Sequence, residues 1–437
     1  MGLALPGHGW HPSGAPGHGP GVSDRSSSLL AMRILHTSDW HLGRTLHGVD
    51  LSGAHARFLD HLAELAASER VDAVLVTGDV FDRALPPVGA VELLDRALAR
   101  LCETTCVVIT PGNHDSPQRL GLNAGLLGDR LHIRARPSAV GTPVTVPAAD
   151  GTPGLLVYAL PYLDPDMTRA ELAERTGSGE PLARTHEAVV SAALRLVRDD
   201  LAARRSGGGG RLPGVVMAHE FVTGGLPSES ERDLRIGGVD SVPAALFSSV
   251  GADYVALGHL HGPQAVAGSR DPQERGAGGA RPAPVMRYAG SPLAFSFSEK
   301  DHHKSTAVVD FDDTGAVAGV RLVPAPVPRR LSDVTGGLGE VLGPRFAARR
   351  EDWVRVTVTG ESRPDNLVHE VKKVFPHALQ VLFEPTGRPR QAQTGTAGVD
   401  DPLTVAAGFV EQVSGRAPDP AERRVLAEAL EAAGRRG

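Results

Sequence analysis

Short apolar runs alternate with amphipathic segments along the first part of the chain. The runs at residues 33–37, 73–77 and 106–109 are rich in β-branched side chains, which is typical of buried strands. Between them, residues 54–69 and 89–101 repeat apolar side chains at helical spacing. This alternation of strand, helix and strand predicts an α/β fold with a largely parallel sheet and crossover helices.

The middle of the chain continues this pattern with further strands. Apolar runs at residues 155–160, 215–218, 254–257 and 305–311 predict strands, and residues 185–204 predict a helix with one apolar face. We therefore expect one large domain that contains all of these elements.

The chain is predicted to have five parts. Residues 1–31 are rich in Gly, Pro, Ser and His without apolar periodicity, which predicts a disordered tail before the large domain at 32–323. A strand, a helix and a strand within 329–386 predict a small α+β domain, and the polar stretch 387–400 predicts a tether. Two amphipathic helices within 401–437 cannot form much of a core, so we expect them to dock on a partner or on their own chain.

Composition and charge restrict the possible functions. Hydrophobic residues make up 41% and charged residues 22% of the chain, as in ordinary globular proteins. The net charge of -6 supplies no overall basic field, so nucleic-acid binding would have to rest on local basic patches or on metal ions. No apolar run approaches the ~20 residues of a membrane span. Cys102 and Cys106 are the only cysteines, which excludes a disulfide framework and makes the cytoplasm the expected compartment.

Residues that can bind metal ions follow several of the predicted strands. The segments SDWH, GDVFD and GNHD come after the first three strands, and a histidine and the segment GHLHG come after two later ones. Because α/β sheets bind their ligands at the carboxyl ends of strands, we expect these side chains to meet. The candidate metal ligands are Asp39, His41, Asp79, Asn113, His219, His259 and His261.

This set of ligands indicates two divalent metal ions. Carboxylate, amide and imidazole ligands without thiolate suit Mn²⁺, Fe or Zn²⁺. Seven ligands are too many for one ion and suit two if one carboxylate bridges them, and Asp79 is the natural bridge because its strand lies between the paired motifs. Two such metals assist in-line displacement at phosphorus. We expect His114 to act as general acid for the leaving oxygen and Asp82 to fix the tautomer of His114 through a hydrogen bond.

The order of these motifs resembles the calcineurin-like metallophosphoesterase superfamily. Within it, MRILHTSDWHLG, GDVFDRA, GNHDS, YVALGHLHG and RYAGSP resemble the SbcD family of Mre-type nucleases. The resemblance implies a four-layer α-β-β-α sandwich of two mixed sheets, in place of one parallel sheet, with residues 329–386 as a capping domain. Residue by residue, it places one metal on Asp39, His41, Asp79 and His261, the other on Asp79, Asn113, His219 and His259, and catalysis on His114.

The resemblance also implies an activity and partners. Members of the SbcD family are Mn²⁺-dependent nucleases that act on DNA as double-strand 3′–5′ exonucleases and as single-strand and hairpin endonucleases. They process DNA ends in repair, recombination and replication, as homodimers together with an SbcC-type ATPase and without a membrane. Residues 401–437 resemble the segment that binds this ATPase.

Two other functions stay open at this point. Arg83 follows Asp82 as in the protein phosphatases of the superfamily, where this arginine holds phosphate, so a phosphatase or phosphodiesterase of small substrates is one alternative. A non-catalytic scaffold at DNA ends is the other, although the complete set of ligands argues against it. Neither the tail nor the Gly-, Arg- and Pro-rich stretch at 268–284 has a counterpart in the resemblance.

Overall fold

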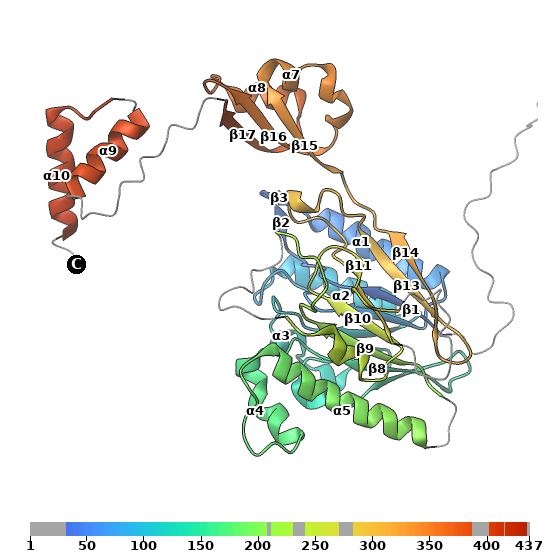
Figure 1. The fold of residues 1–437 in the computed structure, drawn as a ribbon. Coiled ribbons are helices and arrows are strands. Elements are labelled where there is room, and N and C mark those ends of the chain that lie inside the picture. Colours follow the sequence, from blue (N-terminus) through green and yellow to red (C-terminus); the bar gives the residue numbers. More distant parts are fainter. Residues whose placement is uncertain are drawn as a thin grey trace, which may run out of the picture. The chain divides into compact units, whose positions relative to one another are not determined.

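The computed structural model contains a sandwich of two six-stranded sheets (Figure 1). The first sheet contains, in spatial order, β14 (Val317–Pro324), β13 (Ser305–Phe311), β1 (Arg33–Thr37), β4 (Ala73–Thr77), β5 (Cys106–Thr110) and β6 (Leu131–Ile133). The second contains β11 (Gln264–Ala265), β12 (Val285–Tyr288), β10 (Tyr254–Gly258), β9 (Gly214–His219), β8 (Pro153–Ala159) and β7 (Val144–Pro147). The structure describes residues 32–207, 211–229, 241–270, 283–386, 402–414 and 416–434.

Each sheet is parallel in its centre and antiparallel at its edges. Strands β1, β4, β5 and β6 run parallel, as do β8, β9, β10 and β12. Strand β13 is antiparallel to β1 and β14, while β7 and β11 are antiparallel to β8 and β12. The prediction of one largely parallel sheet is therefore wrong, because β7–β8 and β13–β14 are joined by short turns that permit only antiparallel pairing. The two packed mixed sheets that the resemblance implied are confirmed.

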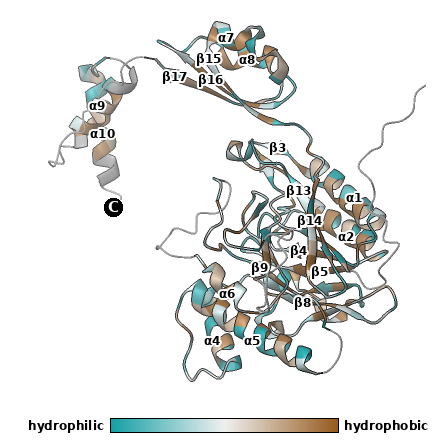
Figure 2. Ribbon diagram, turned by 45° about the vertical axis from the view of Figure 1, so that its right-hand side comes forward, coloured by the Kyte–Doolittle hydropathy of each residue, from teal (hydrophilic) through white to brown (hydrophobic). Residues whose placement is uncertain are grey.

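Helices cover both outer faces of the sandwich and complete its four layers (Figure 1). Those on the first sheet are α1 (Ser52–Ser68) and α2 (Val88–Cys102), and those on the second are α4 (Pro165–Arg175), α5 (His186–Ser206) and α6 (Ala244–Ser248). Along β4, Val74 packs toward the helices and Leu75 toward the second sheet. Central strands are thus buried on both faces, which explains their continuous apolar runs (Figure 2).

A smaller sheet follows the sandwich in the sequence. It has the order β15 (Leu331–Gly337), β16 (Trp353–Gly360) and β17 (Ala378–Pro385), with helices α7 (Leu338–Leu342) and α8 (Leu367–Val374). Val354, Val356 and Val358 are buried and alternate with half-buried residues, so β16 has one core face. The short elements are β2 (Thr45–Leu46), β3 (Val49–Asp50), α3 (Pro117–Leu120), η1 (Ala124–Leu126), η2 (Pro137–Ala139), η3 (Phe297–Glu299) and η4 (Pro344–Arg349).

The C-terminal segment contains two helices, α9 (Pro402–Ser414) and α10 (Pro420–Gly434), within the region 401–437 where the sequence predicts two. They belong to a different compact unit from the sandwich. The predicted tail at 1–31 and tether at 387–400 lie outside the described residues, and the predicted domain limits stay predictions. Among the described residues, no helix has the length and apolar character needed to cross a membrane.

Candidate active site

The ends of strands from both sheets converge at the candidate site. In the first sheet β1, β4 and β5 end level, because Thr37 lies beside Val76 and Thr77 lies beside Thr110. From the second sheet, His219 at the end of β9 donates from Nδ1 to the Thr77 carbonyl at 3.0 Å. The turns that follow these strands therefore share one space between the two sheets.

Four of the predicted ligands have an unusual backbone conformation. The φ angles are 54° at Asp39, 46° at His41, 48° at Asp79 and 102° at His259. Positive φ costs a non-glycine residue on the order of 1–3 kcal/mol and tends to cluster at functional sites. Hydrogen bonds from the Asp39 N–H to the Gly78 carbonyl (3.1 Å) and from the His41 N–H to the Asp79 carbonyl (2.9 Å) hold the first two turns together.

Two glycines allow these turns to approach one another. A side chain on Gly112 would overlap the carboxylate and the backbone nitrogen of Asp79. A side chain on Gly258 would overlap the Thr77 carbonyl and press on His219. The glycines that open GNHD and GHLHG are therefore required by close packing around the ligands.

The ligands form two groups with Asp79 between them. Asp39, His41 and His261 present ligand atoms that all lie within 4.8 Å of one another, and so do Asp39, Asp79 and His219. The Nε2 atoms of His41 and His261 are 3.1 Å apart. Asp79 Oδ2 lies 3.6 Å from His41 Nε2 and 3.5 Å from His219 Nε2, so one carboxylate oxygen faces both groups.

Asn113 and His259 complete the second group. Asn113 Oδ1 lies 3.0 Å from His219 Nε2 and 3.3 Å from His259 Nδ1. The structure thus brings all seven predicted ligands together, six of them buried and Asn113 half-buried. Buried carboxylate and amide oxygens that face imidazole nitrogens at such distances fit divalent metal ions.

The charges of the ligands are distributed unevenly. Burial opposes the ionisation of Asp79, but His219 and His41 hold its pKa well below the usual range. Burial also opposes the charge of His219, but Asp79 raises the pKa of this imidazole to about 10. Burial raises the pKa of Asp39 to about 6 and lowers the pKa of His259 to about 3. Near neutral pH the metal-free site therefore holds a charged Asp79–His219 pair.

This pair makes metal binding depend on pH. A metal requires neutral His219, whereas a pKa of about 10 keeps the imidazole protonated in the metal-free protein. Binding must release this proton, so metal affinity is expected to rise with pH, by about tenfold per unit between roughly pH 7 and 8. Titration calorimetry with Mn²⁺ in two buffers of different ionisation enthalpy measures both the affinity and the proton release. An affinity that does not change with pH would contradict the protonated state of His219.

His114 lies beside the ligands and close to Asp82. Its Nδ1 donates to the backbone carbonyl of Asp82 at 2.8 Å, and its Nε2 faces Asp79 Oδ2 at 3.9 Å. The Asp82 carboxylate lies 3.7 Å from His41 Nδ1 and 3.3 Å from Arg44 Nη1. The hydrogen bond from His114 Nδ1 thus goes to the main chain of Asp82. An oxygen of the Asp82 carboxylate also lies within 4.8 Å of a ring nitrogen of His114, and the predicted bond between these two side chains stays a prediction.

Arg44 is a neighbour of the ligands that sequence reasoning did not identify. Its guanidinium lies 4.7 Å from the centre of the Phe295 ring. That ring packs edge-on against the imidazoles of His41 and His261. Arg83, in contrast, has an exposed side chain. Arg44 follows the SDWH motif, but its position in the sequence gives no sign of this contact.

Asp115 joins two of the turns that carry ligands. Its buried carboxylate accepts hydrogen bonds from the backbone N–H groups of Val80 (3.0 Å), Phe81 (2.9 Å) and Gly112 (2.9 Å). The GDVFD turn and the GNHD turn are therefore held at a fixed distance by one side chain. Its place directly after the GNH segment was the only available signal for this role.

Replacing Asp115 by alanine is expected to lower the free energy of unfolding by about 3 kcal/mol, because three buried N–H groups lose their carboxyl acceptor. Urea unfolding followed by circular dichroism measures the change. The matched control Asp313→Ala, at an exposed position, is expected to leave stability within about 0.5 kcal/mol of the wild type. Equal stability of the two variants would show that Asp115 does not hold the turns.

Glu299 and Lys304 support His261 from the side opposite the metals. Glu299 Oε1 lies 3.4 Å from His261 Nδ1 and accepts the Phe295 N–H at 3.1 Å. Its other oxygen pairs with Lys304 Nζ, which also donates to the His261 carbonyl (2.9 Å) and to Ser291 Oγ (2.8 Å). A carboxylate in this position orients an imidazole ligand. Glu299 lies 38 residues after His261, so the sequence offers no signal for the contact.

Comparisons with known proteins show to which family the chain is similar. The family model described as calcineurin-like phosphoesterase matches residues 32–263. The chain is similar to the SbcD subunit of the SbcCD nuclease of Escherichia coli (strain K12), with 31% identity over 81% of this chain and 82% of that protein. For the SbcD subunit of Bacillus subtilis (strain 168) the identity is 31%, over 82% and 88% of the two chains. For that of Rhodobacter capsulatus it is 36%, over 71% and 74%.

Proposed function

The chain belongs to the calcineurin-like phosphoesterase family and, within it, to the SbcD family of nuclease subunits, and we propose that it hydrolyses phosphodiester bonds of DNA. The observation that carries this function is the position of Asp79 Oδ2, 3.6 Å from His41 Nε2 and 3.5 Å from His219 Nε2. One carboxylate oxygen between two groups of ligands suits a pair of metals acting on a phosphate.

We assign four ligands to each metal, with Asp79 shared. The first metal takes Asp39, His41, Asp79 and His261, and the second takes Asp79, Asn113, His219 and His259. When bound, two divalent cations supply Lewis acidity and lower the pKa of water. Oxygen and imidazole donors without thiolate suit Mn²⁺, Fe or Zn²⁺. Of these we propose Mn²⁺, the metal that the resemblance to the SbcD family implies.

The protein's own residues place and move the proton. His114 Nε2 faces the ligands, and because Nδ1 donates to the Asp82 carbonyl, the ring gives a proton from Nε2 to the leaving oxygen only as the imidazolium, which the transfer converts to neutral imidazole. The Asp82 carbonyl fixes the orientation of the ring through Nδ1. The Asp82 carboxylate, 3.7 Å from His41 Nδ1, orients that ligand instead. Exposed Arg83 extends the same turn and is our candidate for contact with a phosphate of the DNA.

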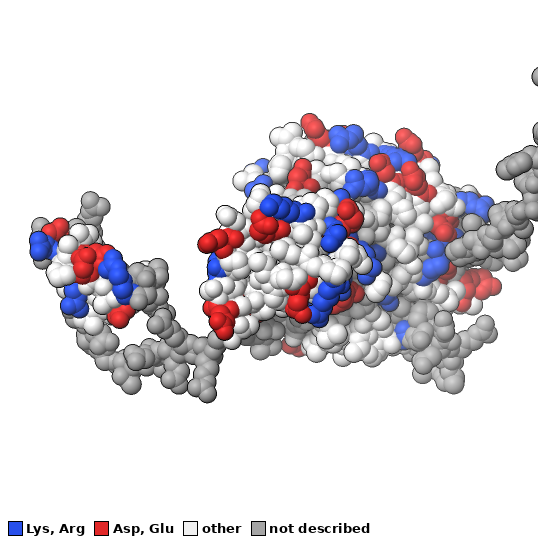
Figure 3. Space-filling model, turned by 90° about the horizontal axis from the view of Figure 1, so that it is seen from above, with Lys and Arg blue, Asp and Glu red and all other residues white. Residues whose placement is uncertain are grey.

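We infer that the substrate is DNA. The protein acts on it as a double-strand 3′–5′ exonuclease and as a single-strand and hairpin endonuclease. Figure 3 shows one face on which Lys and Arg are interspersed with Asp and Glu, so contacts with the DNA backbone are local. The test is Mn²⁺-dependent cleavage of an end-labelled DNA hairpin, with and without an SbcC-type ATPase. Hydrolysis of p-nitrophenyl phosphate without cleavage of DNA would instead favour a phosphatase of small substrates.

We propose that the C-terminal helices bind the ATPase partner. Val405 and Phe409, one helical turn apart on α9, are 58% and 66% exposed, and Val425 on α10 is 64% exposed. Exposed apolar side chains at helical spacing are suited to a hydrophobic surface of a partner.

Deleting residues 401–437 is expected to abolish co-purification with the ATPase while leaving the metal content unchanged, because the metal ligands lie in the other compact unit. Phe409→Glu is expected to weaken the complex, whereas Glu411→Gln on the same helix is the matched control. Co-purification of the truncated chain would contradict docking through these helices.

We also propose a homodimer that works in the cytoplasm. Leu85, Val88 and Val91, at the start of α2, are 63%, 74% and 46% exposed, which suits contact with a second copy. The chain has only two cysteines, and a composition poor in cysteine suits the reducing cytoplasm. Sedimentation of the wild type and of Val88→Glu tests the dimer.

A further inference from the structure

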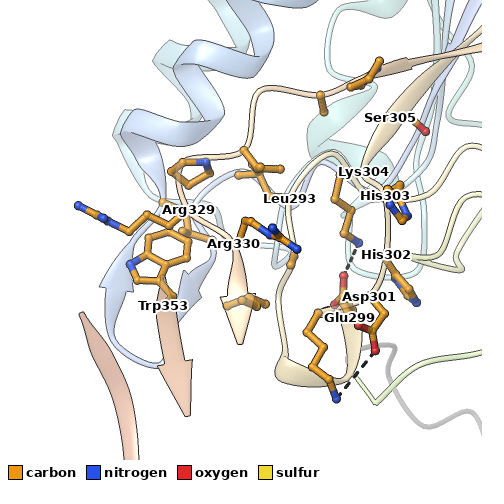
Figure 4. A pocket seen from close by; sticks show the side chains of 18 of the residues that line it. Leu293, Glu299, Asp301, His302, His303, Lys304, Ser305, Arg329, Arg330 and Trp353 are labelled. Carbon is orange, nitrogen blue, oxygen red and sulfur yellow. Dashed lines mark hydrogen bonds and ion pairs between the residues drawn. The ribbon is translucent and has the colours of Figure 1, made fainter. Parts of the chain in front are cut away.

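A pocket of about 770 Å³ lies between the sandwich and the small sheet, within one compact unit (Figure 4). One wall is formed by residues 299–305, which connect η3 to β13. The opposite wall is formed by residues 327–331, which lead into β15, and by Trp353 at the start of β16. The volume is within the range of small-molecule sites, and none of the seven metal ligands lines the pocket.

Most of the charged side chains around the pocket already have partners. Lys304 is held by Glu299, by the carbonyl of His261 and by Ser291. Lys300 Nζ lies 3.0 Å from Asp333 Oδ2. The charges of Lys304 and Lys300 are therefore taken up by ion pairs within the protein. They make the pocket more positive but do not offer a free partner to a ligand.

Arg330 is different from the other cations of the pocket. In Figure 4 its side chain extends across the pocket toward Lys304 and Glu299, whereas Arg329 points away from them. Arg329 Nη1 is held by the carbonyl of Glu351 at 2.5 Å. No carboxylate within the part of the chain that the structure describes forms an ion pair with Arg330, which is exposed. A guanidinium in this position suits a phosphate group of a ligand.

The remaining lining is apolar and includes an aromatic ring. Leu322 and Val327 are 40% and 46% exposed, although both lie in the pocket. Leu293 and the indole of Trp353 complete this surface. Leu322 and Val327 thus remain exposed inside the concavity, whereas Leu293 is buried and Trp353 is half-buried. Exposed apolar side chains beside an aromatic ring suit a flat ring of a ligand, such as a nucleic-acid base.

We propose that this pocket binds a nucleoside monophosphate, with the phosphate on Arg330 and the base against Trp353, Leu322 and Val327. The inference rests on the proposed function, because hydrolysis of DNA produces nucleotides with this chemistry. The ligand is either a free nucleotide or the terminal nucleotide of a DNA strand. The pocket is connected to the candidate metal site through one ion pair. Lys304 and Glu299 pair with each other in the pocket wall, and both also contact His261.

The test is titration calorimetry of the full chain with deoxyadenosine monophosphate in the presence of EDTA, so that binding at the metal site does not contribute. We expect one site per chain. Arg330→Ala and Trp353→Ala are each expected to weaken binding by about tenfold. Arg349→Ala is the matched control, because Arg349 is exposed and does not line the pocket, and it is expected to bind like the wild type. Thermal unfolding of each variant checks its folding.

A second titration, with a short single-stranded oligonucleotide, identifies the source of the nucleotide. Tighter binding of the oligonucleotide, lost in Arg330→Ala, supports a DNA end, and tighter binding of the free nucleotide supports the released product. Absence of binding, or equal binding by Arg330→Ala and the wild type, would overturn the pocket. If the wild type still cleaves DNA when the pocket binds no nucleotide, the nuclease function holds and only the pocket proposal fails. The two proposals can therefore fail separately.

Discussion

Replacing His114 by leucine is expected to slow the cleavage of DNA by about a thousandfold while the metal content stays unchanged. The imidazole is held through Nδ1 by the Asp82 carbonyl and directs Nε2 toward Asp79 Oδ2 at 3.9 Å, so its loss removes the proton donor for the leaving oxygen. The backbone N–H of residue 114, which bonds Asp79 Oδ1 at 2.9 Å, is retained in the variant. Hairpin cleavage with Mn²⁺ gives the rate, and elemental analysis of the purified protein gives the metal content.

The matched control is His369→Leu, because His369 is exposed on α8 and lies far from the metal ligands in the sequence. It is expected to cleave like the wild type. Cleavage by His114→Leu at the rate of this control would contradict the acid role. Loss of metal from His114→Leu would instead assign His114 to the metal site and not to proton transfer.

The meeting of the seven candidate ligands could be predicted because each one ends or follows a strand that is buried on both faces. The run at β4 is recognisable from its apolar residues alone, since Val74 and Leu75 both face protein. Once the end of β4 is recognised, the sequence places Asp79 in the turn directly after it. Strand β14 was not predicted, because its residues are mostly exposed or half-buried and lack a continuous apolar run.

The supporting contacts could not be predicted, because they depend on the conformation of turns and on distant segments. The sequence does not show that the Asp82 carbonyl accepts from His114 Nδ1, because only the turn geometry decides this. Glu299 reaches His261 across 38 residues of sequence. Spacing within a motif identifies side chains that face a metal, but it cannot identify the side chains that hold them in place.

Replacing Asp79 by asparagine is expected to remove both metals and to reduce DNA cleavage below detection. The Oδ2 atom of Asp79 faces His41 and His219 at 3.6 and 3.5 Å, so one carboxylate serves both groups of ligands. An amide has nearly the same size, but its oxygen carries no negative charge and is therefore a poor bridge between two cations. Elemental analysis after purification, and titration with Mn²⁺, measure the loss.

The exposed Asp95→Asn on α2 is the matched control and is expected to retain both metals. A second readout separates loss of the bridge from general damage, because Asp79 also raises the pKa of His219 to about 10. Without this carboxylate the pKa of His219 is expected to fall, because burial opposes the charge of the imidazole, and an NMR titration of the ring in the metal-free variant measures the change. Retention of two metals by Asp79→Asn would contradict a bridging role for Asp79. An unchanged NMR titration of His219 in the metal-free variant would show that Asp79 is not the partner that keeps His219 protonated.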